Sequence, residues 1–227
     1  MDDYTASLEA KRQSLLQAGV RMMDPSAVYV EDTVTVGAGT LLLPGTILRG
    51  NTTVGQNCEI GPNTMLTDCT VEDNVTINSS QCSESTIRAG AHVGPFAYIR
   101  PHCTVGRDVK VGDFVELKNS VIGDATKISH LTYVGDSDVG EGVNFGCGTV
   151  TVNYDGNQKH RTTIGDRCFI GCNTNLVAPV TLGDGCYTAA GSTITKDVAP
   201  DALAVARSRQ SELAGWAQRH RKKKERL

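Results

Sequence analysis

The sequence predicts an all-β solenoid, a parallel β-helix of hexapeptide repeats with a short N-terminal helix and a helical, basic C-terminal tail. Apolar residues recur every six positions and are often followed by Gly, as at Val105-Gly106 and Val111-Gly112. The residue four positions after an apolar anchor is small or β-branched, for example Cys103 after Ile99, with Asp138 as the exception. Aromatic residues make up only 5% of the chain, whereas Gly occurs 24 times, so the core has to use small and branched side chains around many tight corners.

Residues 1–20 are expected to form the N-terminal connecting helix. The stretch 3–18 has helical composition, with Leu8, Leu15 and Leu16 as its apolar residues, and Gly19 provides a stop signal. Residues 21–198 are expected to form the β-helix, in which three six-residue units close one triangular coil. Gly residues after the anchors are expected to tolerate the corner dihedral angles.

Two stretches interrupt the repeat. Residues 71–86 have a weaker rhythm and are expected to form a looser coil. A polar insertion at about 152–163 contains the turn pair Asp155-Gly156, so we expect it to project as a loop. After the last anchor, residues 199–227 form the tail, and residues 199–215 have helix-compatible composition.

The charge is unevenly distributed. The chain of 227 residues has a net charge of -3, yet residues 207–227 carry eight Lys or Arg and two Glu. Such a tail can bind nucleic acid, a membrane surface or a phosphate-rich small molecule, or simply be a solvated terminus. The chain has no run of 18 apolar residues and no secretory signal, so we expect no membrane span and a cytoplasmic location.

The eight cysteines are predicted to be reduced thiols, since no CxxC pair occurs and no export signal is present. Cys147 and Cys172 follow an anchor by two residues, which predicts a surface position. No two His residues have metal-ligand spacing, so no metal site is expected. Four other cysteines are predicted to fill small inward positions of the repeat: Cys58, Cys103, Cys168 and Cys186.

His130, in the segment KISHLTYVGD, is the candidate general base, because an imidazole near a carboxylate such as Glu116 can accept a proton near neutral pH. The same residue can equally be a surface His at a coil corner. A β-helix has no built-in cleft, so we expect a homo-oligomer with sites between subunits.

Several segments resemble one family more closely than the repeat alone does. They are GPFAYIRPHCTVG, VGDFVELKNSVIG, SHLTYVGD, VNFGCGTVTVNYDGNQKHRTTIG, CNTNLVAPV, AAGSTIT and ALAVARSRQSELAGW. In this order they resemble the C-terminal half of the bacterial bifunctional N-acetylglucosamine-1-phosphate uridyltransferase/glucosamine-1-phosphate acetyltransferase family, over roughly residues 20–216. The HLTYVGD and VNYDG segments are the most specific, because hexapeptide repeats indicate only the wider acyltransferase superfamily.

The resemblance implies a left-handed β-helix, a homotrimer, and acetyl transfer from acetyl-CoA to the amine of glucosamine 1-phosphate, a step toward UDP-N-acetylglucosamine and the cell envelope. It implies that His130 is the general base, that Glu116 orients it, and that the backbone N–H of Cys147 stabilises the oxyanion. It assigns the sugar phosphate to Arg100, Lys118, Tyr133, Asn144 and Lys159. It assigns acetyl-CoA to Asn153, Tyr154, Cys172, Ala190 and Arg207, and matches Trp216 to a tail tryptophan.

The sequence departs from the family in three places. Cys147 stands where the family often has Ala, and Cys172 where a Ser contacts acetyl-CoA. The chain has no Gly-rich nucleotide loop of the uridyltransferase half, so neither uridyl transfer nor its magnesium ion is expected. Two alternatives stay open: another hexapeptide-repeat sugar acyltransferase, and a non-catalytic trimeric β-helix module.

Overall fold

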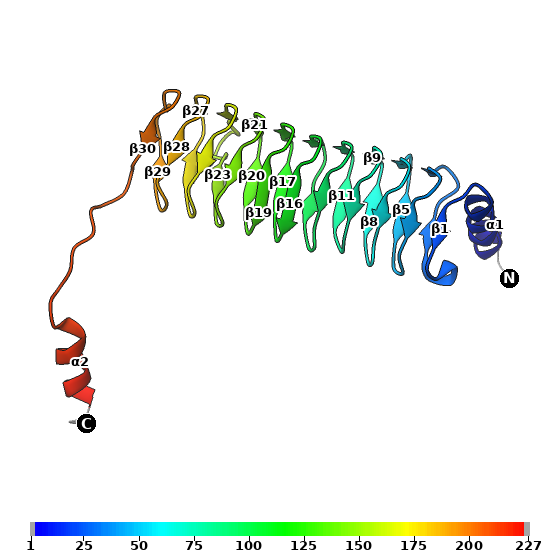
Figure 1. Cartoon of the computed structure of the whole chain (residues 1–227), viewed down its shortest axis with the longest axis horizontal. Helices are drawn as coiled ribbons and strands as arrows, with labels where there is room; N and C mark the ends of the chain where they lie inside the picture. Colours follow the sequence, from blue (N-terminus) through cyan, green and yellow to red (C-terminus); the bar gives the residue numbers. More distant parts are fainter. Residues whose placement is uncertain (1–2, 225–227) are drawn as a thin grey trace.

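The chain folds into a three-sided parallel β-solenoid, described by a computed structural model that places residues 3–224 (Figure 1). Successive strands of each coil belong in turn to three sheets, which we call sheet A with 11 strands, sheet B with 10 and sheet C with nine. Backbone groups of one coil therefore bond to the coils before and after it, as the anchor repeat predicts.

The strands are short, and consecutive strands of the chain belong to different sheets. Sheet A contains β1 (Arg21–Met22), β4 (Leu41–Leu42), β7 (Glu59–Ile60), β10 (Thr76–Ile77), β13 (His92–Val93), β16 (Lys110–Asp113), β19 (Lys127–His130), β22 (Asn144–Phe145), β25 (Phe169–Ile170), β28 (Tyr187–Thr188) and β30 (Leu203–Ala204). Sheet B contains β2 (Tyr29–Val30), β5 (Ile47–Arg49), β8 (Met65–Thr67), β11 (Gln81–Ser83), β14 (Tyr98–Ile99), β17 (Glu116–Lys118), β20 (Tyr133–Gly135), β23 (Val150–Val152), β26 (Asn175–Val177) and β29 (Thr193–Ile194). Sheet C contains β3 (Thr35–Val36), β6 (Thr53–Val54), β9 (Thr70–Val71), β12 (Thr86–Ile87), β15 (Thr104–Val105), β18 (Val121–Ile122), β21 (Ser137–Val139), β24 (Thr162–Ile164) and β27 (Val180–Leu182).

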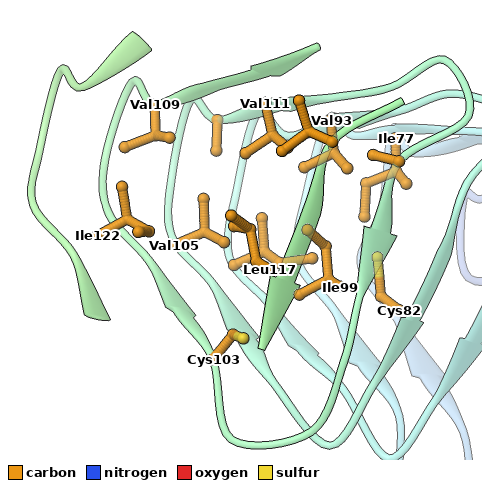
Figure 2. Close-up of a cluster of buried hydrophobic side chains, with 14 of the residues drawn as sticks. Ile77, Cys82, Val93, Ile99, Cys103, Val105, Val109, Val111, Leu117 and Ile122 are labelled. Carbon is orange, nitrogen blue, oxygen red and sulfur yellow. The ribbon is translucent and has the colours of Figure 1, made fainter. Parts of the chain in front are cut away.

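The anchors form the core. Figure 2 shows Val111 of sheet A, Leu117 of sheet B and Ile122 of sheet C pointing into the same interior, where each is at most 1% exposed. The small positions complete the packing, and the predicted placement of the cysteines is confirmed. Cys172 is exposed and Cys147 half-buried, whereas the four predicted inward thiols are buried: Cys58, Cys103, Cys168 and Cys186.

The expected looser coil at 71–86 is regular instead. Cys82 pairs in register with Leu66 of the coil before and Ile99 of the coil after. The rhythm is weak in the sequence because a cysteine occupies a position where both neighbouring coils have a large aliphatic anchor. Its side chain is only 3% exposed, so the inward pattern continues without interruption.

The expectation for the glycines after the anchors holds only at Gly61 and Gly94, which have positive φ, and most of the others have a different purpose. Gly112 and Gly123 do not have positive φ; instead, a Cβ on either would lie within 2.4 Å of a backbone atom of the next coil. These glycines let adjacent coils approach closely. The left-handed corner conformation is often taken by other residues, including Phe114 (φ 55°) and Leu131 (φ 42°).

The two ends differ. Helix α1 (Asp3–Gln17) buries Leu8 and Leu15 against the first coils. At the other end, the expected helical composition of residues 199–215 does not produce a helix. Residues 203–204 form β30, which extends sheet A beyond residue 198 by pairing with β28, and an exposed segment then leads to α2 (Trp216–Lys224) (Figure 1). Among the described residues, neither the α-helices α1 and α2 nor the 3-10 helix η1 (Pro25–Ala27) has the length and apolar character that a membrane crossing requires.

Candidate active site on sheet B and its corner

The register of the strands arranges a straight column of predicted site residues at the corner between sheets A and B. Asp113 pairs directly with His130. Cys147, Cys172 and Ala190 each follow an inward residue of sheet A by two positions, as His130 does, and these inward residues are paired in register from coil to coil. We call this column the corner strip: Asp113, His130, Cys147, Cys172 and Ala190.

His130 contacts a different carboxylate from the one expected. Its Nδ1 lies 2.7 Å from Oδ1 of Asp113, one coil below. Glu116, which was expected to orient His130, instead accepts a hydrogen bond of 2.8 Å from Arg100. The hydrogen bond with His130 lowers the pKa of Asp113, so Asp113 is ionised and fixes one ring nitrogen of His130. The side chain of His130 is 59% exposed, which leaves its other nitrogen open to a reactant.

The N–H of Cys147 lies in the next coil above His130. Among residues 3–224 this N–H has no hydrogen-bond acceptor, although the carbonyl of Cys147 accepts from the N–H of Asn173 at 2.8 Å. An unpaired backbone donor one coil from an imidazole is suited to stabilise a developing oxyanion.

Three cations gather on sheet B, and we call them the basic cluster: Arg100, Lys118 and Lys159. Arg100 and Lys118 extend outward from neighbouring strands, and Lys159 reaches them from the inserted loop. The ammonium group of Lys118 lowers the pKa of Lys159, and the charge of Arg100 adds to this effect. The three cations have two carboxylate partners, Glu116 and Asp136, so positive charge is in excess, which favours an anionic ligand.

A buried carboxylate, Asp136, organises the base of the basic cluster. It accepts hydrogen bonds from Lys118 at 2.9 Å and from Asn119 at 2.6 Å, and also from the amide of Asn153. Its side chain is only 5% exposed. Burial alone would raise the pKa of Asp136, but hydrogen bonds from Asn119, Lys118 and Asn153 outweigh it and lower the pKa. Burial likewise opposes the charge of Lys118, but Asp136 raises its pKa.

Tyr133 lies between the corner strip and the basic cluster. Its ring folds over Gly135, and a side chain at position 135 would displace the phenol from this place. The phenol oxygen accepts a hydrogen bond of 3.4 Å from the amide of Asn153. Tyr133 and Asn153 therefore belong to one connected polar surface with Asp136.

The inserted loop occupies residues 153–161, between β23 and β24. Its turn is closed by Asp155, which accepts from the N–H groups of Asn157 and Gln158 at 2.8 Å and lies 2.8 Å from Nε2 of His160. These contacts lower the pKa of Asp155. A structured loop of this kind positions Lys159 beside Lys118 at a low cost in chain entropy.

The structure separates some of the predicted residues. Asn144 lies on sheet A, apart from the other residues predicted to bind the sugar, which belong to sheet B. Tyr154 is 56% exposed in the inserted loop, and its hydroxyl donates to the carbonyl of Gly156. Arg207 is close to the upper end of the corner strip, because a Cβ on Gly191 would lie 3.8 Å from its Cδ. Trp216 stacks on His220 in α2, with ring centroids 3.8 Å apart, away from both groups.

Sequence reasoning missed Asp113 and Asp136. Asp113 could have been found by counting one coil back from His130, because the repeat places the two residues in register. Asp136 is part of the HLTYVGD segment, but nothing in the sequence distinguishes a buried carboxylate from a surface one. Across the described part of the chain, no group of three or more His, Cys, Asp or Glu side chains is arranged to hold a metal ion.

Comparisons with known proteins agree with this architecture. The family model described as bacterial transferase hexapeptide (six repeats) matches residues 33–68, 84–119 and 161–196. The bifunctional protein GlmU of Clostridium perfringens is 56% identical over 208 residues, which are 92% of this chain and 46% of that protein. GlmU of Brevibacillus brevis is 52% identical over 202 residues, 89% of this chain and 44% of that protein. The chain thus spans slightly less than half the length of these relatives.

Among solved structures, the UDP-N-acetylglucosamine acyltransferase of Francisella novicida superposes with a TM-score of 0.53 at 16% identity, covering 80% of this chain and 66% of that one. At this level of identity the likeness concerns the fold, which is the same kind of solenoid.

Proposed function

The chain belongs to the hexapeptide-repeat transferases as a homologue of part of GlmU, and from this premise we propose that it transfers the acetyl group of acetyl-CoA to the amine of glucosamine 1-phosphate. The product, N-acetylglucosamine 1-phosphate, is a precursor of UDP-N-acetylglucosamine and of the cell envelope. The proposed reaction takes place in the cytoplasm. Uridyl transfer is not proposed for this chain.

The observation that carries the proposal is the basic cluster on the same sheet as the His130 corner. In glucosamine 1-phosphate the amine on C2 is next to the carbon that carries the phosphate, so an anion-binding group and a proton acceptor have to lie close together. Arg100, Lys118 and Lys159 would bind the phosphate by charge-assisted hydrogen bonds. The repulsion that lowers the pKa of Lys159 would be relieved by the bound anion, so phosphate binding and full protonation of Lys159 support each other.

The proposed mechanism is direct transfer. The substrate amine arrives largely as ammonium, and His130 accepts its proton while Asp113 holds the imidazole. The free amine attacks the thioester carbonyl, and the unpaired N–H of Cys147 stabilises the oxyanion that develops. Collapse of this intermediate releases the coenzyme A thiolate. His130 can return its proton to that thiolate, and the nitrogen loses its second proton to water as the amide forms, so the protein needs no acyl intermediate.

Acetyl-CoA is proposed to lie along the upper corner strip, from Cys147 past Cys172 and Ala190 to Arg207. This path runs along the solenoid axis, and Arg207 would contact a phosphate of the coenzyme. Cys172 would contact the coenzyme less strongly than a serine, because a thiol is a weaker hydrogen-bond donor.

A homotrimer is proposed because one chain distributes the predicted residues over more than one face. Asn144 is on sheet A and Tyr133 on sheet B, so a site that uses both needs the corner of one chain against a face of another. The row beside the corner strip is also apolar and open: Phe96, Phe114 and Leu131 are 57–60% exposed. Covering this row with a neighbouring subunit would remove it from water.

The test is product identification with purified protein, acetyl-CoA and a panel of amines. Acetylation of glucosamine 1-phosphate, measured by thiol release and confirmed by product mass, supports the proposal. Preferential acetylation of a nucleotide-linked amino sugar would indicate a different hexapeptide-repeat acyltransferase. A folded trimer with no acetylation of any amine would indicate a structural module.

The basic cluster leads to a prediction about substrate choice. Glucosamine 1-phosphate should be acetylated with a kcat/KM at least about 100-fold above that of free glucosamine, since losing contacts to a phosphate costs several kcal/mol. Lys118→Ala and Arg100→Ala should each raise the KM for the sugar phosphate and narrow this ratio. Steady-state kinetics on both sugars checks it, and equal efficiency on both sugars would remove the basic cluster from the substrate site.

The tail leads to a second prediction. Arg207→Ala should raise the KM for acetyl-CoA by about 10-fold at every ionic strength, since it removes a direct contact. Truncation after Gln218 should raise it less, and mostly at low salt, because the remaining basic residues supply only a screened field. Kinetics at two salt concentrations separates the effects. An unchanged KM for Arg207→Ala would take Arg207 out of the coenzyme site, and a truncation that dissociates the oligomer would make the tail an assembly element.

A further inference from the structure

We infer that Cys147 and Cys172 form an oxidisable dithiol on the corner strip, which closes to a disulfide bond when the folded protein reacts with a peroxide. None of the roles described above requires two thiols at this place. The two cysteines also stand where the related family often has Ala and Ser, so the pair is a feature of this chain.

The strand register brings the two cysteines together. Phe145 pairs with Ile170 on one side of the corner, and Val150 pairs with Asn175 on the other. Cys147 comes two residues after Phe145 and three before Val150, and Cys172 has the same spacing from Ile170 and Asn175. Cys147 therefore lies opposite Cys172 in the next coil. The hydrogen bond of 2.8 Å from the N–H of Asn173 to the carbonyl of Cys147 fixes this alignment. Neighbouring parallel strands lie about 4.8 Å apart, within the Cα separation of about 4.4–6.8 Å that disulfide bonds span.

Access distinguishes this pair from the other thiols. Cys172 is exposed and Cys147 half-buried, whereas the other six cysteines are buried. The chain also provides an internal control. Cys168 and Cys186 have their Sγ atoms 3.7 Å apart, but they are at most 1% exposed, and burial raises the pKa of Cys186 to about 12. Oxidation requires an oxidant that reaches the sulfur atom and a thiolate that reacts with it. Burial opposes both, so Cys168 and Cys186 should stay reduced although their sulfur atoms are close.

The chemistry needs one peroxide molecule. The thiolate of Cys172 attacks a peroxide oxygen, the O–O bond breaks, and a sulfenic acid and one water form after proton uptake. The thiol of Cys147 then attacks the sulfenic sulfur, the S–O bond breaks, and a second water leaves as the S–S bond forms. In total, two thiols lose two electrons and two protons, and hydrogen peroxide is reduced to two waters. A dithiol reductant reverses the reaction by exchange.

Oxidation should also lower acetyl transfer, and this consequence rests on the proposed function. The disulfide bond would remove the thiol donor of Cys172 and tie its side chain to the corner that contains the oxyanion donor of Cys147. The bond itself can be detected without any turnover, so the chemical pair and the proposed function can fail separately.

The experiment treats the folded protein with equimolar hydrogen peroxide, alkylates the remaining thiols with iodoacetamide, and maps peptides without reduction. Trypsin, chymotrypsin and Asp-N are used together, because cleavage after Phe169 and before Asp184 separates Cys172 from Cys168 and from Cys186. We expect a Cys147–Cys172 cross-linked peptide, monomer mobility on a non-reducing denaturing gel, and a loss of acetyl transfer of at least fivefold that dithiothreitol restores.

The variants Cys147→Ser and Cys172→Ser serve as matched tests, each compared with its own untreated rate. Both should lose the cross-link and the reversible inhibition. A Cys168–Cys186 cross-link, a Cys172–Cys172 link between chains, or sulfinic acid at Cys172 without a cross-link would each overturn the inference. A Cys147–Cys172 bond that leaves the rate unchanged would confirm the pair and overturn its effect on catalysis.

Discussion

Replacing His130 with Ala should lower kcat for acetyl transfer by about 10²- to 10⁴-fold, the usual range for loss of a general base. The substrate amine is largely protonated at neutral pH, and no other imidazole lies on the corner strip. The fold should persist, because the His130 side chain is 59% exposed and outside the packed interior. Steady-state kinetics with circular dichroism and a size measurement of the oligomer check both parts.

Three further variants sharpen this result. His92→Ala removes an exposed histidine of sheet A and should leave kcat unchanged. Asp113→Asn keeps the shape but not the charge of the group that contacts His130, so it should lower kcat with little change in KM. Glu116→Gln acts through Arg100 and should mainly raise the KM for the sugar phosphate. If Glu116→Gln lowers kcat and Asp113→Asn does not, Glu116 is the residue that positions His130. A nearly unchanged kcat for His130→Ala would mean that another base accepts the proton.

Replacing Asp136 with Ala should destabilise the protein by about 2–4 kcal/mol, because it leaves the ammonium of Lys118 and two side-chain amides without their buried acceptor. The side chain of Lys118 is 16% exposed, so water compensates only part of this loss. The KM for the sugar phosphate should rise as well, since Lys118 and Asn153 lose their fixed positions. Chemical denaturation of the parent and the variant measures the free-energy difference.

The control is Asp138→Ala, two residues away. Asp138 pairs with Arg161 at 2.6 Å, but both side chains are 42–50% exposed, so its loss should cost less than about 1 kcal/mol. A pH series adds an independent check. The folded-state pKa of Asp136 is depressed below its ordinary value of 3.8, so its stabilisation is present above that value and is lost as the pH falls. The difference between the parent and Asp136→Ala should therefore narrow between about pH 5 and pH 3, and a constant difference would rule out an ionic role.

The fold was predictable to a large extent because the repeat encodes it directly. An inward anchor such as Leu117 and a small residue such as Cys103 satisfy the same packing rule in every coil. The prediction was wrong at the C-terminal end, where it relied on amino-acid composition and not on the repeat. Residues 199–215 lack a helix because helix-compatible composition without buried contacts does not outweigh pairing of β30 to sheet A.

The site was only partly predictable. The resemblance pointed to His130 and Lys118, and each side chain has a carboxylate partner, Asp113 and Asp136 respectively. It could not indicate that Asp113 contacts His130 or that Asp136 is buried, because these facts depend on which residues are opposite each other in adjacent coils. Sequence spacing gives such pairs only after the register of every coil is known.

The constant register of the coils has a consequence for how such a sequence can change over time. One added residue within a strand would turn every later outward side chain inward and would shift the upper corner strip relative to His130. Extra residues at the corner between sheets B and C do neither: the loop 153–161 lengthens one coil, yet Cys172 remains opposite Cys147. We therefore expect insertions and deletions among natural variants to be confined to corners. The chain can then acquire new recognition loops there while the spacing of its reactive groups stays fixed.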